Sequence, residues 1–484
     1  MRADLQAARK PSFESSFISS LISSKTDPTM SIRSNSPNFG FSHTAGAIPL
    51  RGNASPRTAR SPLQDLLEEK GYNYAQRGSS SALELTPGGT SHEKNLIENG
   101  TAFRDISAFC TIELTGKDAL IFLDRLTTNN LLDLEVGKCR RTIFCNDRGG
   151  IIDSVLVVTE TDRILLFGSV NCSEKLTRWI NRYIAKDEVT VTDVTGTIGA
   201  LEVYGPQAES ATILISGIID EEPERVYFFE FEEMVFSLLK YRFAGKIDRY
   251  LIYGSETAIK KLTNFVLEYQ GPFSLGFVGE EAITELNIKS VVPGAAEIVD
   301  IFHPFEIELT DEVASGKKNF IGRDTLLRPE FFERVQRKFV PLEVVSGEFL
   351  SSALPADFNG APTILGEEPA ALGGAPAAFK GAPAILGEEP AALGGAPGSA
   401  SDSGSTKESR GDGLHRLPAL PVFLTDEEGK EVGVLTTVSS ISHNGSRAAV
   451  GVVKQTHMTP GKKLFFEKGE VIVKEFPLLK DQAL

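Results

Sequence analysis

The chain has 484 residues, which is long enough for several domains with sizeable hydrophobic cores. Its formal net charge of −15 argues against general binding to nucleic acids or anionic membranes, because their phosphates would be repelled. Since no apolar run approaches the roughly 18 residues that a membrane span requires, we predict a cytoplasmic protein without a membrane partner.

The cysteines and histidines favour neither disulfides nor metal binding. Cys110, Cys139, Cys145 and Cys172 show no Cys-x-x-Cys spacing, so free buried thiols in a reducing compartment are expected. The histidines are scattered, with no pair at the spacing of ligands on one helix. A zinc site is therefore not expected.

The N-terminal region, residues 1–62, is rich in serine and arginine and poor in acidic residues. It lacks apolar periodicity, so we predict a disordered extension. We favour a plain tail of a cytoplasmic protein, with Met30 closer to the true start as a variant of this interpretation. The alternative is an organellar transit peptide, because that class of segment has a similar composition.

Helices and strands alternate irregularly after residue 63. Apolar residues at helical spacing predict one helix after Thr115, with Asp118 as capping partner, and another from Ser173. Strands are predicted at 140–146, 151–158, 163–168, 189–194, 198–204, 225–238 and 247–253. This mixture indicates an α+β fold rather than a doubly wound parallel sheet.

Residues 350–413 interrupt the globular pattern with two near-copies of a segment of about 21 residues, rich in glycine, alanine and proline. Two copies are too few for a solenoid, which needs about three repeats to bury a core. We therefore predict a disordered low-complexity insertion. The short strands that follow it are typical of a small barrel or sandwich.

A glycine turn that leads into an apolar strand is the most informative motif. It reads Asn-Asp-Arg-Gly-Gly-Ile-Ile-Asp over residues 146–153 and continues into Val155 to Val158. Because side chains alternate along a strand, Asp153 shares a face with Val155 and Val157. An acid beside an apolar wall would favour a ligand that carries an amine. The alternative is a turn residue that faces water.

The order of this motif, the segment 115–130 before it and the segment 318–326 after it resembles the glycine cleavage T-protein (aminomethyltransferase) and its YgfZ-type folate-binding relatives. The resemblance covers roughly residues 95–345 and 417–478. It implies a multidomain core of mixed sheets and helices around a central cavity, here residues 63–335, plus a small C-terminal β-barrel. The barrel would take residues 336–349 as its first strand and 414–484 as its remainder.

In this family a tetrahydrofolate occupies the central cavity, and an aspartate binds and orients the folate amine that takes the one-carbon unit. By motif position Asp153 matches that aspartate, which implies a catalytic and cofactor-binding role. A carboxylate next to an amine stabilises developing positive charge and assists proton movement. Its effect grows as water is excluded.

The resemblance implies four further folate-binding residues. Asn129 matches an asparagine of the family's Thr/Ala-Asn-Asp segment, and Phe243 takes the place of a folate-contacting tyrosine. Asn146 matches the asparagine that opens the glycine turn, where capping of the turn is the alternative. Ser169 stands where the family often has an asparagine before the second helix, and the alternative there is a helix cap.

Other family positions are changed. The family's Gly-Tyr-Thr-Gly-Glu reads Arg-Phe-Ala-Gly-Lys here, which ends in Lys246, and its Arg-x-Glu reads Glu-Leu-Asn at 285–287. A tyrosine is replaced by Arg141. Arg140, Arg141, Lys246 or Lys289 could contact the glutamate carboxylates of a folate; the alternative is a solvated basic surface. The YgfZ cysteine is Asn319 here, so a mechanism that needs this thiolate cannot operate.

We therefore predict a tetrahydrofolate-binding protein with a regulatory role or a role in supporting iron–sulfur enzymes and tRNA modification. Iron–sulfur proteins would then be its partners. The first alternative is a genuine aminomethyltransferase of the glycine cleavage system, with a lipoyl carrier protein as its partner. The second is a non-catalytic scaffold that presents the 350–413 insertion. Whether the chain is an enzyme stays open at this stage.

Overall fold

The computed structural model describes residues 58–219, 222–328, 336–346, 420–443, 445–467 and 469–475. The expected disorder of the N-terminal extension up to residue 57 and of the 350–413 insertion lies outside these ranges. Residues 58–62, expected in the extension, belong to the fold instead. Ala59 forms a β-bridge with Ser80, and the buried Ser61 donates a hydrogen bond to Asp105 over 2.5 Å.

A six-stranded sheet has the order β10-β11-β12-β9-β3-β13, in which only β13 runs parallel to its neighbour. Its strands are β3 (Thr101–Asp105), β9 (Ile198–Tyr204), β10 (Val226–Phe231), β11 (Met234–Phe243), β12 (Ile247–Ser255) and β13 (Leu275–Phe277). Alternate residues point to opposite faces. Leu238 packs toward α6 (Ala208–Ser216) and α7 (Glu256–Glu268), whereas Leu239 packs toward the second large sheet.

The second large sheet is antiparallel with the order β5-β6-β7-β4-β8. Its strands are β4 (Thr111–Thr115), β5 (Cys139–Cys145), β6 (Ile151–Thr159), β7 (Ile164–Phe167) and β8 (Thr190–Asp193). The helices α4 (Ala119–Leu126) and α5 (Ser173–Arg182) cover one face, and the six-stranded sheet packs near the other. All nine residues of β6 are buried because both faces of this strand are covered.

The predicted cap of α4 is wrong. The helix begins at Ala119, and Asp118 at its N-cap makes no side-chain bond to the helix. The Asp118 carboxylate instead accepts a hydrogen bond from the backbone N–H of Glu188, 2.8 Å away. A tertiary partner has thus replaced the local capping interaction that the sequence suggested.

The C-terminal part forms a closed barrel of order β14-β17-β16-β15-β18-β19. Its strands are β14 (Arg337–Ser346), β15 (Val422–Thr425), β16 (Glu431–His443), β17 (Ser446–Lys454), β18 (Lys463–Phe466) and β19 (Gly469–Val473). Apolar residues such as Leu342, Leu435 and Val471 fill its interior. The expected α+β class with a small C-terminal β-barrel is confirmed.

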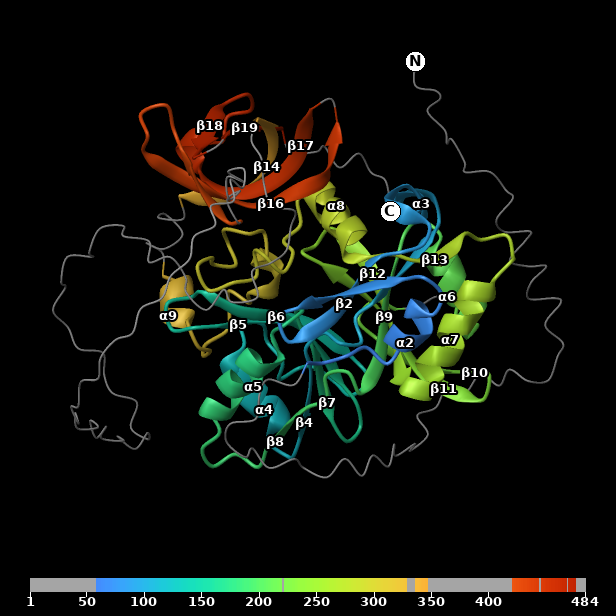
Figure 1. The fold of residues 1–484 in the computed structure, drawn as a ribbon. Coiled ribbons are helices and arrows are strands. Elements are labelled where there is room, and N and C mark those ends of the chain that lie inside the picture. The colour runs from blue at the N-terminus through green and yellow to red at the C-terminus, as the bar shows by residue number, and fades with distance from the viewer. Residues whose placement is uncertain are drawn as a thin grey trace, which may run out of the picture. The chain divides into compact units, whose positions relative to one another are not determined.

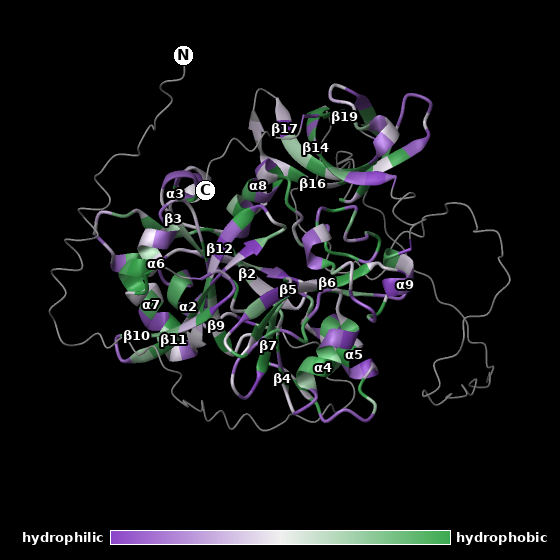
Figure 2. Ribbon diagram, turned by 180° about the vertical axis from the view of Figure 1, so that it is seen from behind, coloured by the Kyte–Doolittle hydropathy of each residue, from purple (hydrophilic) through white to green (hydrophobic). Residues whose placement is uncertain are grey.

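The remaining elements connect these parts. They are α2 (Gln64–Glu68), β1 (Asn73–Arg77), β2 (Ser80–Leu85), α3 (Gly89–Asn99), α8 (Glu280–Ser290), η1 (Thr310–Glu312), α9 (Arg323–Leu326) and η2 (Gln455–His457). The helix α8 lies against β16 and β17, so it links the sheets to the barrel (Figure 1). Figure 2 shows hydrophobic residues along α4 and α6, the helices that cover the sheets.

We predict that Phe339→Ala destabilises the protein by about 3–5 kcal/mol, because this fully buried ring of β14 would leave a cavity between the barrel and the sheets. Phe423→Ala is the matched control, since that ring on β15 is 39% exposed. The control should lose no more than about 1 kcal/mol. Denaturant unfolding measures both values, and equal losses would contradict the packing described.

Candidate functional site

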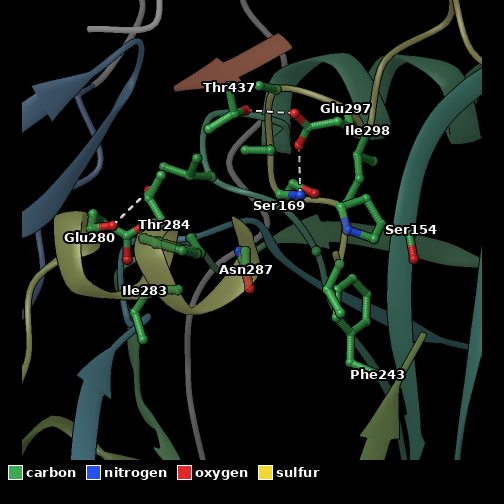
Figure 3. Close-up of a pocket in the computed structure, with 18 of the residues that line it drawn as sticks. Ser154, Ser169, Phe243, Glu280, Ile283, Thr284, Asn287, Glu297, Ile298 and Thr437 are labelled. Atoms are coloured by element: carbon green, nitrogen blue, oxygen red, sulfur yellow. Dashed lines mark hydrogen bonds between the residues drawn. The ribbon is translucent and has the colours of Figure 1, made fainter. Parts of the chain in front are cut away.

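A cavity of about 210 Å³ lies between the two large sheets, α8 and the barrel strands β16 and β17. Its apolar wall includes Ile106, Phe109, Leu156, Leu251 and Ile283. Ligand sites for drug-sized molecules span about 300–1,000 Å³, so this volume suits a ring-sized part of a ligand. Figure 3 shows side chains from the sheets, α8 and the barrel facing this space. The expected central cavity is confirmed.

Phe243 forms an aromatic surface of the cavity at the end of β11. The guanidinium carbon of Arg249 lies 4.2 Å from the centre of this ring, and that of Arg141 lies 4.5 Å away. Both contacts are within the range of favourable cation–π interactions. The two arginines therefore hold the phenyl ring in place, and all three residues line the cavity.

The polar end of the cavity centres on the buried carboxylate of Glu202 in β9. It accepts hydrogen bonds from Arg104 over 2.8 Å, from Arg249 over 3.3 Å, and from the hydroxyls of Tyr204 and Tyr241. Burial by itself would raise the pKa of Glu202, but the two guanidinium charges and the hydroxyls together hold it well below its usual range. Glu202 therefore stays ionised.

Two polar atoms on residues that line the cavity have no hydrogen-bond partner among the described residues. They are Nε of Arg249 and Oδ1 of Asn287. A buried polar atom without a partner costs about 1–3 kcal/mol. A bound ligand that accepts from the first or donates to the second would recover this energy.

Asp153 lies behind the cavity wall rather than in it. Its side chain is fully buried and does not line the cavity, whereas Ser154 and Ser169 do. The carboxylate accepts hydrogen bonds from Ser169 Oγ over 2.6 Å, from Ser169 N over 3.1 Å and from Ser154 N over 2.9 Å. Burial raises the pKa of Asp153, although the bonds from Ser169 oppose this shift.

The register of β6 explains this position. Asp153 pairs with Phe144, and Ser154 pairs with Ile143. As the sequence indicated, Asp153 shares a face with Val155, but this face packs against α4 and α5. The opposite face, which carries Ser154 and Leu156, lines the cavity. In this structure Asp153 therefore does not line the cavity, and it is not exposed to water as a turn residue would be.

The carboxylate of Asp153 also explains a glycine in the wall. A Cβ atom on Gly168 would stand 2.4 Å from Asp153 Oδ2 and 3.4 Å from Cys110 Sγ. Gly168 lines the cavity and precedes Ser169. Any larger residue at position 168 would collide with the Asp153 carboxylate. At this point only the backbone of Gly168 lies between that carboxylate and the cavity. Asp153 is connected to the cavity wall by the two hydrogen bonds that it accepts from Ser169.

Of the other predicted site residues, Ser169 and Phe243 line the cavity, whereas Asn129 and Asn146 do not. Asn129 Nδ2 donates to the carbonyl of Arg141 over 2.9 Å and so supports β5. Asn146 Oδ1 accepts from the backbone N–H groups of Arg148 and Gly150, each over 2.9 Å. This is the turn-capping role given as the alternative. Ser169 bonds to Asp153 and does not cap α5.

The basic residues considered as anion contacts are mostly engaged elsewhere. Lys246 Nζ donates to the carbonyl of Val291 over 2.9 Å, and Lys289 forms an exposed ion pair with Glu98. Arg140 pairs with Asp133. Among these four candidates, Arg141 alone lines the cavity.

The sequence reading missed Arg104, Glu202, Arg249 and Glu297, all of which line the cavity. They belong to no local motif and come together only in the tertiary structure. One signal was available: Glu202 and Arg249 interrupt apolar strands, where a charged residue is rarely buried without a partner.

The four cysteines are buried and free of disulfides. In the part of the chain that the structure describes, no helix is long and apolar enough to cross a membrane.

Comparisons with known proteins agree with this architecture. A profile for the GCVT N-terminal domain matches residues 72–316. The aminomethyltransferase of Bacillus mycoides (strain KBAB4) is 25% identical over 296 residues, which are 59% of this chain and 79% of that protein. The aminomethyltransferase of Caldanaerobacter subterraneus is 28% identical over 262 residues, 52% of this chain and 68% of that protein.

Among solved structures, the glycine cleavage system aminomethyltransferase T from Bartonella henselae has a TM-score of 0.60 at 17% identity. The match covers 87% of this chain and 98% of that chain, and it shows a shared fold. The two sheets, the cavity and the barrel thus define a T-protein-like fold. The chain belongs to the glycine cleavage T-protein family, as a divergent member.

We predict that Asp153→Asn changes how stability depends on pH. Because the folded-state pKa of Asp153 is raised, the folded state holds its proton more tightly than the unfolded state does. The wild type therefore loses stability as pH rises from about 3.9, the ordinary value for aspartate, through the raised pKa. The variant lacks this loss, so the stability difference, variant minus wild type, should rise with pH.

Urea unfolding between about pH 4 and about pH 7 measures this difference. Asp162→Asn, on an exposed residue of the turn before β7, controls for the loss of one negative charge. A constant difference between Asp153→Asn and wild type across this range would show that burial does not perturb the Asp153 carboxyl.

Proposed function

We propose that the cavity binds tetrahydrofolate or a one-carbon-substituted folate. The observation that carries this proposal is a cavity with an apolar wall, one aromatic ring held by two arginines, and two polar atoms without partners. A flat heterocycle with donors and acceptors on its rim suits such a site. Membership of the T-protein family supports the same class of ligand.

Phe243 would contact the face of the pteridine ring, and Ser154, Ser169 and Asn287 would bind its polar groups. A bound tetrahydrofolate supplies amines that accept or carry a one-carbon unit. The sheets line this place on one side, and barrel residues such as Val450 line it on the other. These contacts require no carboxylate from position 153.

We infer that the protein binds folate without the aminomethyl transfer named for its relatives. The cavity wall has Ser154 where an acid would be needed next to the folate amine. The hydroxyl of Ser154 donates to Glu312 over 2.6 Å, and Glu312 in turn pairs with Arg141 over 2.9 Å. The Glu312 carboxylate is thus already engaged by Ser154 and Arg141.

A regulatory role, or support of iron–sulfur enzymes and tRNA modification, would use folate binding alone. This assignment rests on the family's order of motifs combined with the loss of the Tyr-Thr-Gly-Glu segment, which ends in Lys246 here. Residues 317–324 are the counterpart of the cysteine segment of YgfZ-type proteins. The segment carries Asn319 in place of their cysteine, so a thiolate does not take part. Iron–sulfur proteins are the partners that this role predicts.

The second candidate is aminomethyl transfer from a lipoyl carrier protein to tetrahydrofolate. The curated relatives with 25–28% identity, which carry the name aminomethyltransferase, favour it. In that case the protein would release ammonia when given tetrahydrofolate and an aminomethylated lipoyl carrier protein. We expect no ammonia above the background without enzyme, and steady turnover would establish the second candidate in place of the first.

We predict saturable binding of tetrahydrofolate and 5-formyl-tetrahydrofolate by the full chain in anaerobic calorimetry. Phe243→Ala should weaken binding by about tenfold, equivalent to about 1.4 kcal/mol, because the ligand loses its aromatic surface. Phe228→Ala is the matched control, since that ring on β10 is 41% exposed and does not line the cavity. Absence of wild-type binding at roughly millimolar ligand, weaker than any physiological folate site, would remove the proposal.

A further inference from the structure

Glu297 is a buried carboxylate in the wall of the cavity, in the segment that follows α8. It is 1% exposed. Its Oε1 accepts a hydrogen bond from the Thr437 hydroxyl of β16 over 2.6 Å, and its Oε2 accepts one from the backbone N–H of Gly294 over 2.7 Å. Figure 3 shows the bond between Thr437 and Glu297.

Glu297 differs from the other carboxylates of the cavity in having no cationic partner. Glu202 and Glu280 each form an ion pair with Arg104, at 2.8 Å and 2.6 Å. Within the described ranges no lysine, arginine or histidine forms an ion pair with Glu297. A carboxylate has about four lone-pair sites, so two neutral donors leave acceptor capacity unused. A buried charge compensated this weakly is costly.

A second unused acceptor lies close to Glu297. Oδ1 of Asn287 has no hydrogen-bond partner in the part of the chain that the structure describes, and Figure 3 shows this side chain reaching from α8 toward the middle of the cavity. A Cβ atom on Gly294 would lie 3.4 Å from Asn287 Nδ2 and 3.5 Å from Glu297 Oε2. The two side chains therefore border one small notch, which glycine leaves open.

We propose that Glu297 and Asn287 form a subsite for the N–H edge of a ligand ring, the edge on which a ring N–H and an exocyclic amino group stand side by side. A carboxylate binds two parallel N–H donors with short, charge-assisted bonds, and the neighbouring amide oxygen can take a further donor. In the proposed folate ligand this edge is the 2-amino-4-oxo edge of the pteridine, so the subsite rests on the proposed function.

Thr437 gives the barrel a part in this subsite. Its hydroxyl donates to one oxygen of the Glu297 carboxylate, and the backbone N–H of Gly294 donates to the other. Thr437 is thus a positioning residue. Through this bond β16 would determine the orientation of the carboxylate that receives the ring edge.

The test compares two ligands on the full chain by calorimetry: tetrahydrofolate and its 2-desamino-2-methyl analogue, which lacks the exocyclic amino donor. Glu297→Gln should weaken tetrahydrofolate binding by about tenfold or more, because an amide N–H₂ group replaces an acceptor oxygen. The analogue keeps the ring N–H and lacks only the amino donor, so its affinity should fall less on this substitution than that of tetrahydrofolate. Glu268→Gln, on an exposed carboxylate at the end of α7, is the matched control and should change neither affinity.

Gly294→Ala is the second variant and keeps the test decisive if Glu297→Gln fails to fold. The added methyl group would meet Asn287 Nδ2 at 3.4 Å and Glu297 Oε2 at 3.5 Å, which are ordinary contact distances, yet it fills the notch between the two side chains. Tetrahydrofolate should again bind about tenfold more weakly than to wild type.

The outcomes separate the subsite from the proposed function. If wild type binds tetrahydrofolate and the two variants bind it equally well, the subsite is refuted and folate binding stands. Equal losses for tetrahydrofolate and the analogue in Glu297→Gln would also refute it, because the effect would then be structural. If wild type binds neither ligand, the proposed function fails and the subsite with it.

Discussion

The alternation of side chains along β6 is the constraint on which the site depends. Because the strand is covered on both faces, each residue belongs either to the α4 and α5 side or to the cavity side. A shift of one residue would exchange the two sets. The actual register places a serine, residue 154, at the cavity and an acid, residue 153, behind it. The register of β6 therefore determines which polar side chains of this strand line the cavity.

Compensation of buried charge shapes the rest of the cavity. Arg104 and Arg249 converge on Glu202 and keep it ionised, and Arg141 pairs with Glu312. Arg141 and Arg249 also hold Phe243 in place through its ring. These ion pairs and ring contacts form a polar network within the protein, which makes the side chains around the cavity rigid. What it leaves unsatisfied marks the places where a ligand would bind.

The candidate site was only partly predictable from the sequence. Phe243 and Ser169, which line the cavity, were named because they occupy positions to which the family resemblance assigns contacts with folate. Asn146 was named with two possible roles, and its amide takes the second of them, the capping of the turn. Arg249 and Glu297 were missed because their importance comes from strands and segments that are distant in sequence. A local sequence motif does not indicate such long-range contacts.

The sequence by itself determined the α+β class, the apolar strand after the glycine turn, the C-terminal barrel and the family, because these rest on periodicity, turn residues and motif order. Only the tertiary structure decided which face of β6 meets the cavity and which buried charges find partners. Both depend on how separate sheets pack, and packing is a property of the whole chain. Asp153 illustrates the difference: its strand was predictable, but its environment was not.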